Sequence, residues 1–90
     1  MVHIFIILMY DINSKRVNKV LKICRKYLTW VQNSVLEGNI TNANLERMIA
    51  EIKAVIKEEE DSVLYYKFRT LAYSERVNIG VVKGEETNIL

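Results

Sequence analysis

The chain has 90 residues, half of them hydrophobic, which suits a single domain with a modest core. One cysteine and one histidine exclude an internal disulfide framework, a cysteine-based zinc site and a histidine-rich metal cluster. A reducing cytoplasm is the simplest compartment for such a chain. The formal net charge of +2 does not by itself indicate a nucleic-acid binder, but its distribution is uneven. Residues 1–36 hold six bases against one acid, whereas residues 37–90 hold seven bases against ten acids. This asymmetry predicts a basic surface built from the first third of the chain.

The first predicted element is a strand over Val2–Asp11, VHIFIILMYD. Its β-branched and aromatic content favours a strand, and it is too short to cross a bilayer as a helix. Both alternating sets of side chains are mostly apolar, so both faces of the strand should be buried. Two helices in a chain of this size can cover only one face of a sheet. The second face therefore predicts a homodimer.

A basic helix is predicted next, over about residues 14–28, with Asn13 or Ser14 as its cap. Its apolar residues recur at helical spacing: Val17, Val20, Leu21, Cys24, Tyr27 and Leu28. Its polar side carries a lysine stripe with Arg16 beside its start, and the stripe comprises Lys15, Lys19, Lys22 and Lys26. Like charges at this spacing cost a few tenths of a kcal/mol per pair. The stripe is either a binding surface for phosphates or an ordinary solvated face.

A second β region is predicted over residues 29–40, with a bend or bulge at Gln32–Ser34. Thr41 should cap a second helix whose buried stripe comprises Leu45, Met48, Ile49, Ile52, Val55 and Ile56. The acidic run Glu58–Asp61 is interpreted as a solvated helix end and turn in preference to a metal-binding cluster. Its four carboxylates oppose the helix dipole, so the helix should fray there.

The remaining elements are a strand over Ser62–Phe68, a connector over Arg69–Glu75, a short strand over Val77–Val82 and a tail. This order predicts an α+β, ferredoxin-like βαββαβ fold with an additional short C-terminal strand. Two helices should cover one face of an antiparallel sheet. Residues 1–90 form one domain, in which 77–90 supply a C-terminal strand and tail that can dock on the partner protomer.

Catalytic constellations are scarce, since there is no Gly-rich phosphate loop, no Cys-His pair and no G-x-S-x-G motif. The candidate that remains is Tyr10-Asp11, at the end of the first strand and next to a helix. One carboxylate is a poor Mg²⁺ site, but two copies across a twofold axis make a better one. Alternatively, Asp11 caps the helix or begins the turn. Ser34 is a candidate phosphate contact or an ordinary serine of a strand bend.

Five segments in order resemble the CRISPR-associated Cas-two (Cas2) family: ILMYDI, K-R-V-x-K-V, VQNSVLEGNIT, EEDSVLYY and RVNIG. The resemblance covers about residues 1–80. It implies a ferredoxin-like homodimer packed through its sheet faces, with a C-terminal strand that usually crosses to the partner's sheet. It also implies metal-dependent endonuclease activity on RNA or DNA, and a bridging role with the Cas-one integrase in spacer acquisition.

The resemblance also implies roles for individual residues. Asp11 corresponds to the family's key aspartate, with Tyr10 before it. Our hypothesis is that one Mg²⁺ is shared by the two Asp11 of the dimer. The nucleic-acid-binding residues that the resemblance implies are Lys15, Arg16, Lys19 and Ser34, and the lysine stripe adds Lys22 to them. The chain departs from the family at Trp30, where many members have a basic residue, and at Leu36, where they usually have Phe. The departure at Trp30 predicts weak or absent cleavage.

The preferred hypothesis is a cytoplasmic spacer-acquisition scaffold: a homodimer, not attached to a membrane, whose basic helices hold duplex DNA by its phosphates. The second hypothesis is a Mg²⁺-dependent phosphodiesterase that acts on single-stranded RNA or on DNA through paired Asp11 carboxylates. Two alternatives share the fold: a toxin-type endoribonuclease, and a non-catalytic regulatory dimer that binds no nucleic acid. The basic stripe on the first helix argues against the regulatory dimer.

Overall fold

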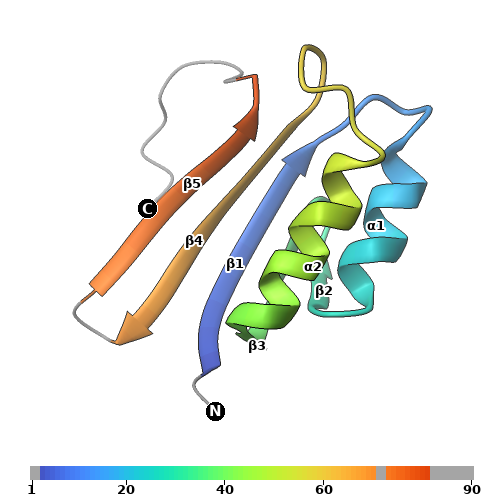
Figure 1. The fold of residues 1–90 in the computed structure, drawn as a ribbon. Helices are drawn as coiled ribbons and strands as arrows, with labels where there is room; N and C mark the ends of the chain where they lie inside the picture. Colours follow the sequence, from blue (N-terminus) through green and yellow to red (C-terminus); the bar gives the residue numbers. More distant parts are fainter. Residues whose placement is uncertain (1–2, 71–72, 82–90) are drawn as a thin grey trace.

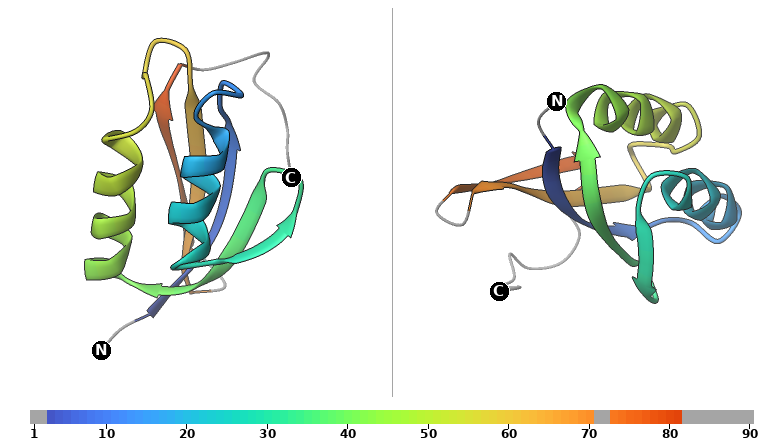
Figure 2. Two further views of the ribbon diagram at one scale, coloured as in Figure 1. Left: turned by 90° about the vertical axis from the view of Figure 1, so that its right-hand side faces the viewer. Right: turned by 90° about the horizontal axis from the view of Figure 1, so that it is seen from below.

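The computed structural model describes residues 3–70 and 73–81 as one five-stranded antiparallel sheet with two helices (Figure 1). The elements in chain order are β1 (His3–Asp11), α1 (Val17–Arg25), β2 (Thr29–Gln32), β3 (Val35–Thr41), α2 (Asn42–Lys53), β4 (Ser62–Thr70) and β5 (Tyr73–Gly80). The strand order is β2-β3-β1-β4-β5, and both helices lie on the same face of the sheet (Figure 2). The predicted ferredoxin-like α+β fold is confirmed. Neither described helix combines the length and apolar character needed to cross a membrane.

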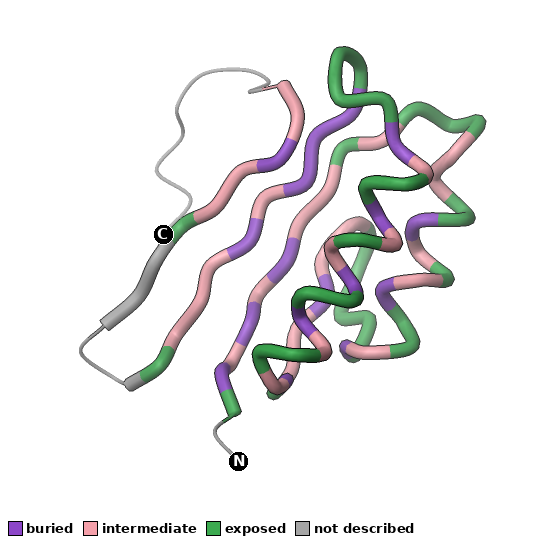
Figure 3. Tube along the Cα trace, viewed as in Figure 1, coloured by how far each residue is buried: buried purple, intermediate pink, exposed green. Residues whose placement is uncertain are grey.

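Strand β1 is the central strand of the sheet, and both of its faces are apolar. Ile4, Ile6 and Leu8 are buried in the core under the helices, whereas the alternating residues between them are only partly buried. Buried positions therefore recur every second residue along β1, and the buried residues of β4 are Ser62, Val63 and Tyr65 (Figure 3). The core is completed by apolar residues from both helices and from the neighbouring strands, among them Val20, Leu36, Met48, Ile52 and Val63.

Helix α1 is shorter than predicted by about three residues at each end. Before it, the Asn13 carbonyl accepts hydrogen bonds from Arg16 N at 2.8 Å and Val17 N at 3.0 Å. The Asn13 side chain accepts a hydrogen bond from Lys15 N at 2.9 Å, so Asn13 organises a turn and does not cap the helix directly. Lys15 consequently lies in this turn, outside the helical lysine stripe.

The second β region and the start of its helix follow the sequence pattern, but α2 ends at Lys53, before the predicted stripe residues Val55 and Ile56. Strands β2 and β3 are separated by Asn33 and Ser34, and Asn33 adopts a left-handed φ of 42°. The register also shifts between Trp30 and Gln32, so the predicted interruption is both a bend and a bulge. Thr41 caps α2 as predicted, because its hydroxyl accepts a hydrogen bond from Asn44 N at 3.2 Å.

The predicted connector over Arg69–Glu75 is wrong. Strand β4 continues to Thr70, and β5 begins at Tyr73 and pairs with β4 of the same chain. Cross-strand backbone pairing stabilises this hairpin although its sequence shows no clear alternation. Of the segment 77–90 that was predicted to dock on a partner protomer, residues 77–80 pair with β4 of the same chain, and the tail beyond residue 81 lies outside the described residues.

Candidate nucleic-acid interface

Several predicted site residues gather where β1 ends. Tyr10 N donates a hydrogen bond to the Ser34 carbonyl at 3.1 Å, which brings the β2–β3 turn to this end of the sheet. Asp11 is the cross-strand neighbour of Ser62, and Ser62 is in turn the neighbour of Gly80. The loop between β1 and α1 and the loop between α2 and β4 meet at the same end, at the tip of the β1 arrow in Figure 1.

The two predicted catalytic side chains point to opposite faces of the sheet. Tyr10 packs against the hydrophobic core, and burial, with a smaller contribution from Cys24, raises the pKa of its phenol. Asp11 is exposed and, by strand alternation, lies on the face away from the helices. The structure therefore does not bring the Tyr10 phenol and the Asp11 carboxylate together, and the phenol stays protonated at neutral pH.

A complete metal site is absent from the part of the chain that the structure describes. No group of three or more His, Cys, Asp or Glu side chains converges within residues 3–70 and 73–81. Asp11 offers one exposed carboxylate, whereas Mg²⁺ requires octahedral oxygen coordination, completed in part by water. These residues fit the ion only if a second chain supplies a second carboxylate.

Asp61 is the functional-site residue that sequence reasoning missed. Its predicted place in a solvated turn is wrong, because its carboxylate is fully buried. It accepts hydrogen bonds from Asn13 N at 2.9 Å and Lys57 N at 2.9 Å, and from Arg16 Nε at 2.7 Å and Nη2 at 3.1 Å. These bonds join the β1–α1 loop to the α2–β4 loop. Only its place at the end of an acidic run, directly before a buried strand, could have indicated this role.

The charges and backbone around Asp61 are adjusted to this network. The Arg16 guanidinium, followed by the N–H groups of Lys57 and Asn13, holds the pKa of the Asp61 carboxyl well below its usual range despite burial. The Asp61 carbonyl accepts a hydrogen bond from Val81 N at 3.2 Å. Gly80 has a φ of +97°, and a Cβ there would clash with this carbonyl oxygen. The end of β5 thus approaches the Asp61 backbone so closely that only glycine fits.

Arg16 differs from the other predicted phosphate-binding residues, because acids of its own chain already pair with it. Besides its two bonds to Asp61, its Nη2 donates to Glu60 Oε1 at 2.8 Å. The Arg16 side chain is 13% exposed, compared with 49% for Glu60 and 0% for Asp61. Hydrogen bonds to these two carboxylates raise the pKa of the guanidinium. Arg16 is therefore a fixed, permanently charged group with limited access to solvent.

The lysines of this region are more accessible. Lys15, Lys19 and Lys22 are exposed, and no acid occurs within α1. Lys19 and Lys22 line a surface groove of about 480 Å³ whose remaining lining residues are Ile23, Lys26 and Val55. Lys26 also donates a hydrogen bond to Glu51 of α2, so its charge is partly neutralised. Within α1, Lys19 and Lys22 are thus the accessible lysines of the predicted stripe.

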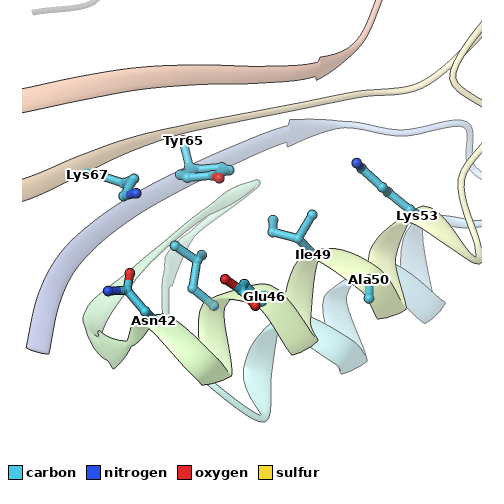
Figure 4. Close-up of a pocket in the computed structure, with 8 residues that line it drawn as sticks. Asn42, Glu46, Ile49, Ala50, Lys53, Tyr65 and Lys67 are labelled. Atoms are coloured by element: carbon cyan, nitrogen blue, oxygen red, sulfur yellow. The ribbon is translucent and has the colours of Figure 1, made fainter. Parts of the chain in front are cut away.

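A second groove lies between α2 and β4, away from these residues. It has a volume of about 340 Å³ and is lined by Asn42, Leu45, Glu46, Ile49, Ala50, Lys53, Tyr65 and Lys67 (Figure 4). Two lysines and one glutamate lie among its polar groups. None of the predicted site residues lines it, so it takes no part in the site at the end of β1.

The sheet face opposite the helices carries an apolar patch, which we call the open face. Cross-strand pairing places Phe5 beside Phe68, Ile7 beside Tyr66 and Met9 beside Leu64 on this face. The six side chains are partly buried, and the Phe68 ring lies 6.3 Å from Phe5 and 6.4 Å from Tyr66, between ring centroids. No helix of the described chain covers them (Figure 2). Asp11 lies at the edge of the open face.

Comparisons with known proteins agree along most of the chain. A family model described as "CRISPR associated protein Cas2" matches residues 4–76. "CRISPR-associated endoribonuclease Cas2" of Dictyoglomus turgidum is 52% identical over 86 residues, 96% of this chain and 99% of the relative. The protein of the same name from Thermotoga maritima is 46% identical over 82 residues, 91% and 94% of the two chains. A solved structure, "Crystal structure of cas2", has a TM-score of 0.73 and 36% identity, covering 98% of this chain and 95% of its own.

Proposed function

The chain belongs to the Cas2 family of CRISPR-associated proteins, and on that premise we propose that it is a spacer-acquisition scaffold. In this role a homodimer holds duplex DNA by its phosphates and bridges subunits of the Cas-one integrase. The observation that carries the proposal is the exposed pair Lys19 and Lys22, on a helix that contains no acid. These ammonium groups are available to phosphate, while Arg16 is held in place beside them.

The open face supports the dimer. Six apolar side chains on a helix-free sheet face form a patch of the kind that marks an interaction site. A twofold axis through this face would bury the patch against its own copy and so provide the cover that one chain lacks. It would also put the basic helices on the two outer surfaces of the dimer, since both helices lie on the other face of each sheet.

Phosphate binding predicts a specific salt dependence. Lysine contacts to phosphate carry no sequence information, so affinity should be nearly the same for duplexes of different sequence. Each neutralised phosphate releases counterions, and a dimer contacting six or more phosphates should lose roughly 10³-fold in affinity between about 50 and 200 mM salt. Binding through contacts to base edges would instead show a sequence preference and a shallower salt dependence.

The test is a gel shift with a double charge reversal, Lys19→Glu with Lys22→Glu. A matched control reverses Arg47 and Lys53, two exposed bases of α2, and changes the net charge by the same amount. We expect the α1 double variant to lose duplex binding and the α2 double variant to retain most of it. Equal loss in both would mean that only net charge matters, and binding retained by the α1 variant would move the site elsewhere.

Bridging of the integrase is tested by co-purification and by integration of a short duplex in the presence of the integrase. The α1 double variant should still co-purify with the integrase and fail to support integration. Failure of the wild-type protein to associate with the integrase would contradict the scaffold role. Duplex binding without such association would leave a DNA-binding dimer of the same fold.

The second candidate function is Mg²⁺-dependent hydrolysis of phosphodiester bonds in RNA or DNA. It is favoured by the exposed Asp11 at the edge of the open face and by the endoribonuclease names of the relatives. In a dimer formed through that face, the two Asp11 carboxylates would hold the ion. A bound Mg²⁺ supplies charge stabilisation and an activated water. The chain itself contributes the carboxylates and the basic groups that position the phosphates.

A further inference from the structure

Arg16 carries two acidic partners of very different character. Asp61 is fully buried, and four hydrogen bonds, two of them to the Arg16 fork, fix its carboxylate. Glu60 is half exposed and has one bond to Arg16 Nη2. Breaking a buried pair leaves an uncompensated charge in the interior, whereas an exposed pair contributes little and exchanges readily with another anion. The Glu60 contact is therefore the one that an incoming anion can replace.

The guanidinium retains donor capacity for such an anion. Asp61 accepts hydrogen bonds from the Nε–H group and from one N–H of Nη2. Within the described residues, no acceptor is bonded to Nη1. A guanidinium presents five N–H donors in a fixed plane, so it can hold a second anion while its first remains in place. A phosphate oxygen has the geometry and charge to take the position of the Glu60 carboxylate.

We propose that Glu60 is a displaceable cover on Arg16, whose place a nucleic-acid phosphate takes while Asp61 keeps the guanidinium fixed. The inference rests on the proposed duplex binding and adds to it a residue that tunes affinity. Glu60 weakens the binding of small anions at Arg16, because every anion must compete with the Glu60 carboxylate of the same chain. Phosphates presented together with contacts to Lys19 and Lys22 can displace it.

The experiment compares three variants that remove the same charge from the same loop: Glu60→Gln, Glu59→Gln and Glu58→Gln. All three residues are exposed, and only Glu60 pairs with Arg16. Affinity for a fluorescent duplex is measured by anisotropy at two salt concentrations. We expect Glu60→Gln to tighten binding by about two- to fivefold beyond both controls, the range expected for an exposed ion pair. The tightening should disappear when Arg16 is changed to Gln, provided that the double variant melts as a folded protein.

Side-chain ¹⁵N spectra of Arg16 supply a measurement that does not depend on the Arg16→Gln variant. Added duplex should shift the Nη signals while the Nε signal, bonded to Asp61, stays in place. Equal affinities for the three glutamine variants with intact wild-type binding, or an Nε signal that moves together with Nη, would overturn the displaceable cover alone. Absence of duplex binding by the wild-type protein would overturn the proposed function and this inference together.

Discussion

Arg16 Nε and Asp61 Oδ2 lie 2.7 Å apart although 45 residues separate them in the sequence. The contact ties the loop that follows β1 to the loop that precedes β4. Since Asp11 and Ser62 are themselves cross-strand neighbours, the two loops lie side by side where they meet the sheet. The ion pair between Arg16 and Asp61 links them. The Asp61 carboxylate thus holds in place the loop that leads into α1, the helix that carries the candidate phosphate-binding lysines.

Removal of this carboxylate should destabilise the protein. Asp61→Ala leaves the Arg16 guanidinium without its buried partner and two backbone N–H groups without an acceptor, so we expect a loss of about 3 kcal/mol in the free energy of unfolding. Urea unfolding at neutral pH measures the change. Glu59→Ala, at an exposed position of the same loop, is the control and should cost less than about 0.5 kcal/mol.

The same carboxylate should make stability depend on pH. The folded-state pKa of Asp61 is held below the unfolded value of about 3.9, so its contribution is present above pH 4 and is lost as the pH falls further. The difference in unfolding free energy between wild type and Asp61→Asn should therefore be largest near neutral pH and shrink below pH 4. A difference that stayed constant down to pH 2.5 would contradict the depressed pKa.

Charge reversal should separate Arg16 from the lysines. Arg16→Glu places a third carboxylate against Asp61 and Glu60, so the melting temperature should fall by several degrees or more. Lys19→Glu alters an exposed position of α1 and should leave the melting temperature nearly unchanged. Thermal unfolding of the two variants, followed by circular dichroism, measures both melting temperatures. Only Lys19→Glu is then informative in binding assays, because Arg16→Glu confounds binding with folding.

The open face should control assembly. Ile7→Glu puts a charge at the centre of the patch, while the helix-side core remains intact. At micromolar concentration we therefore expect the variant to sediment as a folded monomer and the wild type to sediment as a dimer. Val31→Glu, on a 50% exposed residue of the edge strand β2, is the control. A wild-type monomer, or a dimer that survives Ile7→Glu, would exclude the open face as the interface.

Asp11→Asn distinguishes the scaffold from the nuclease. The change keeps the shape of the side chain and removes one negative charge near the phosphates, so duplex binding should be unchanged or slightly tighter. We expect weak or absent Mg²⁺-dependent cleavage by the wild type, and any authentic cleavage should vanish in the variant. Integration with the integrase should persist. Cleavage that continues unchanged in Asp11→Asn comes from another residue or from a contaminant.

Much of the fold follows from local sequence patterns. The two-sided apolar β1, the Thr41 cap and the bend before β3 are encoded by residues that are close in sequence, because alternation, capping and turn chemistry act over a few residues. The exposed Lys19 and Lys22 were predictable for the same reason, since helical spacing alone assigns them to the polar side.

The sequence pattern fails where long-range contacts decide the outcome. The acidic run Glu58–Asp61 suggested four equivalent solvated carboxylates, and only the fold brings Asn13, Arg16 and Lys57 around the last of them. Residues 69–70 and 73–75 belong to strands, because β4 and β5 offer each other's backbone a pairing partner. The sequence by itself determined the element order, the two-faced central strand and the basic helix. The tertiary structure alone decided which acid is buried, which base it holds, and that Tyr10 and Asp11 face opposite sides, because these outcomes depend on desolvation and hydrogen bonds between segments that meet only after folding.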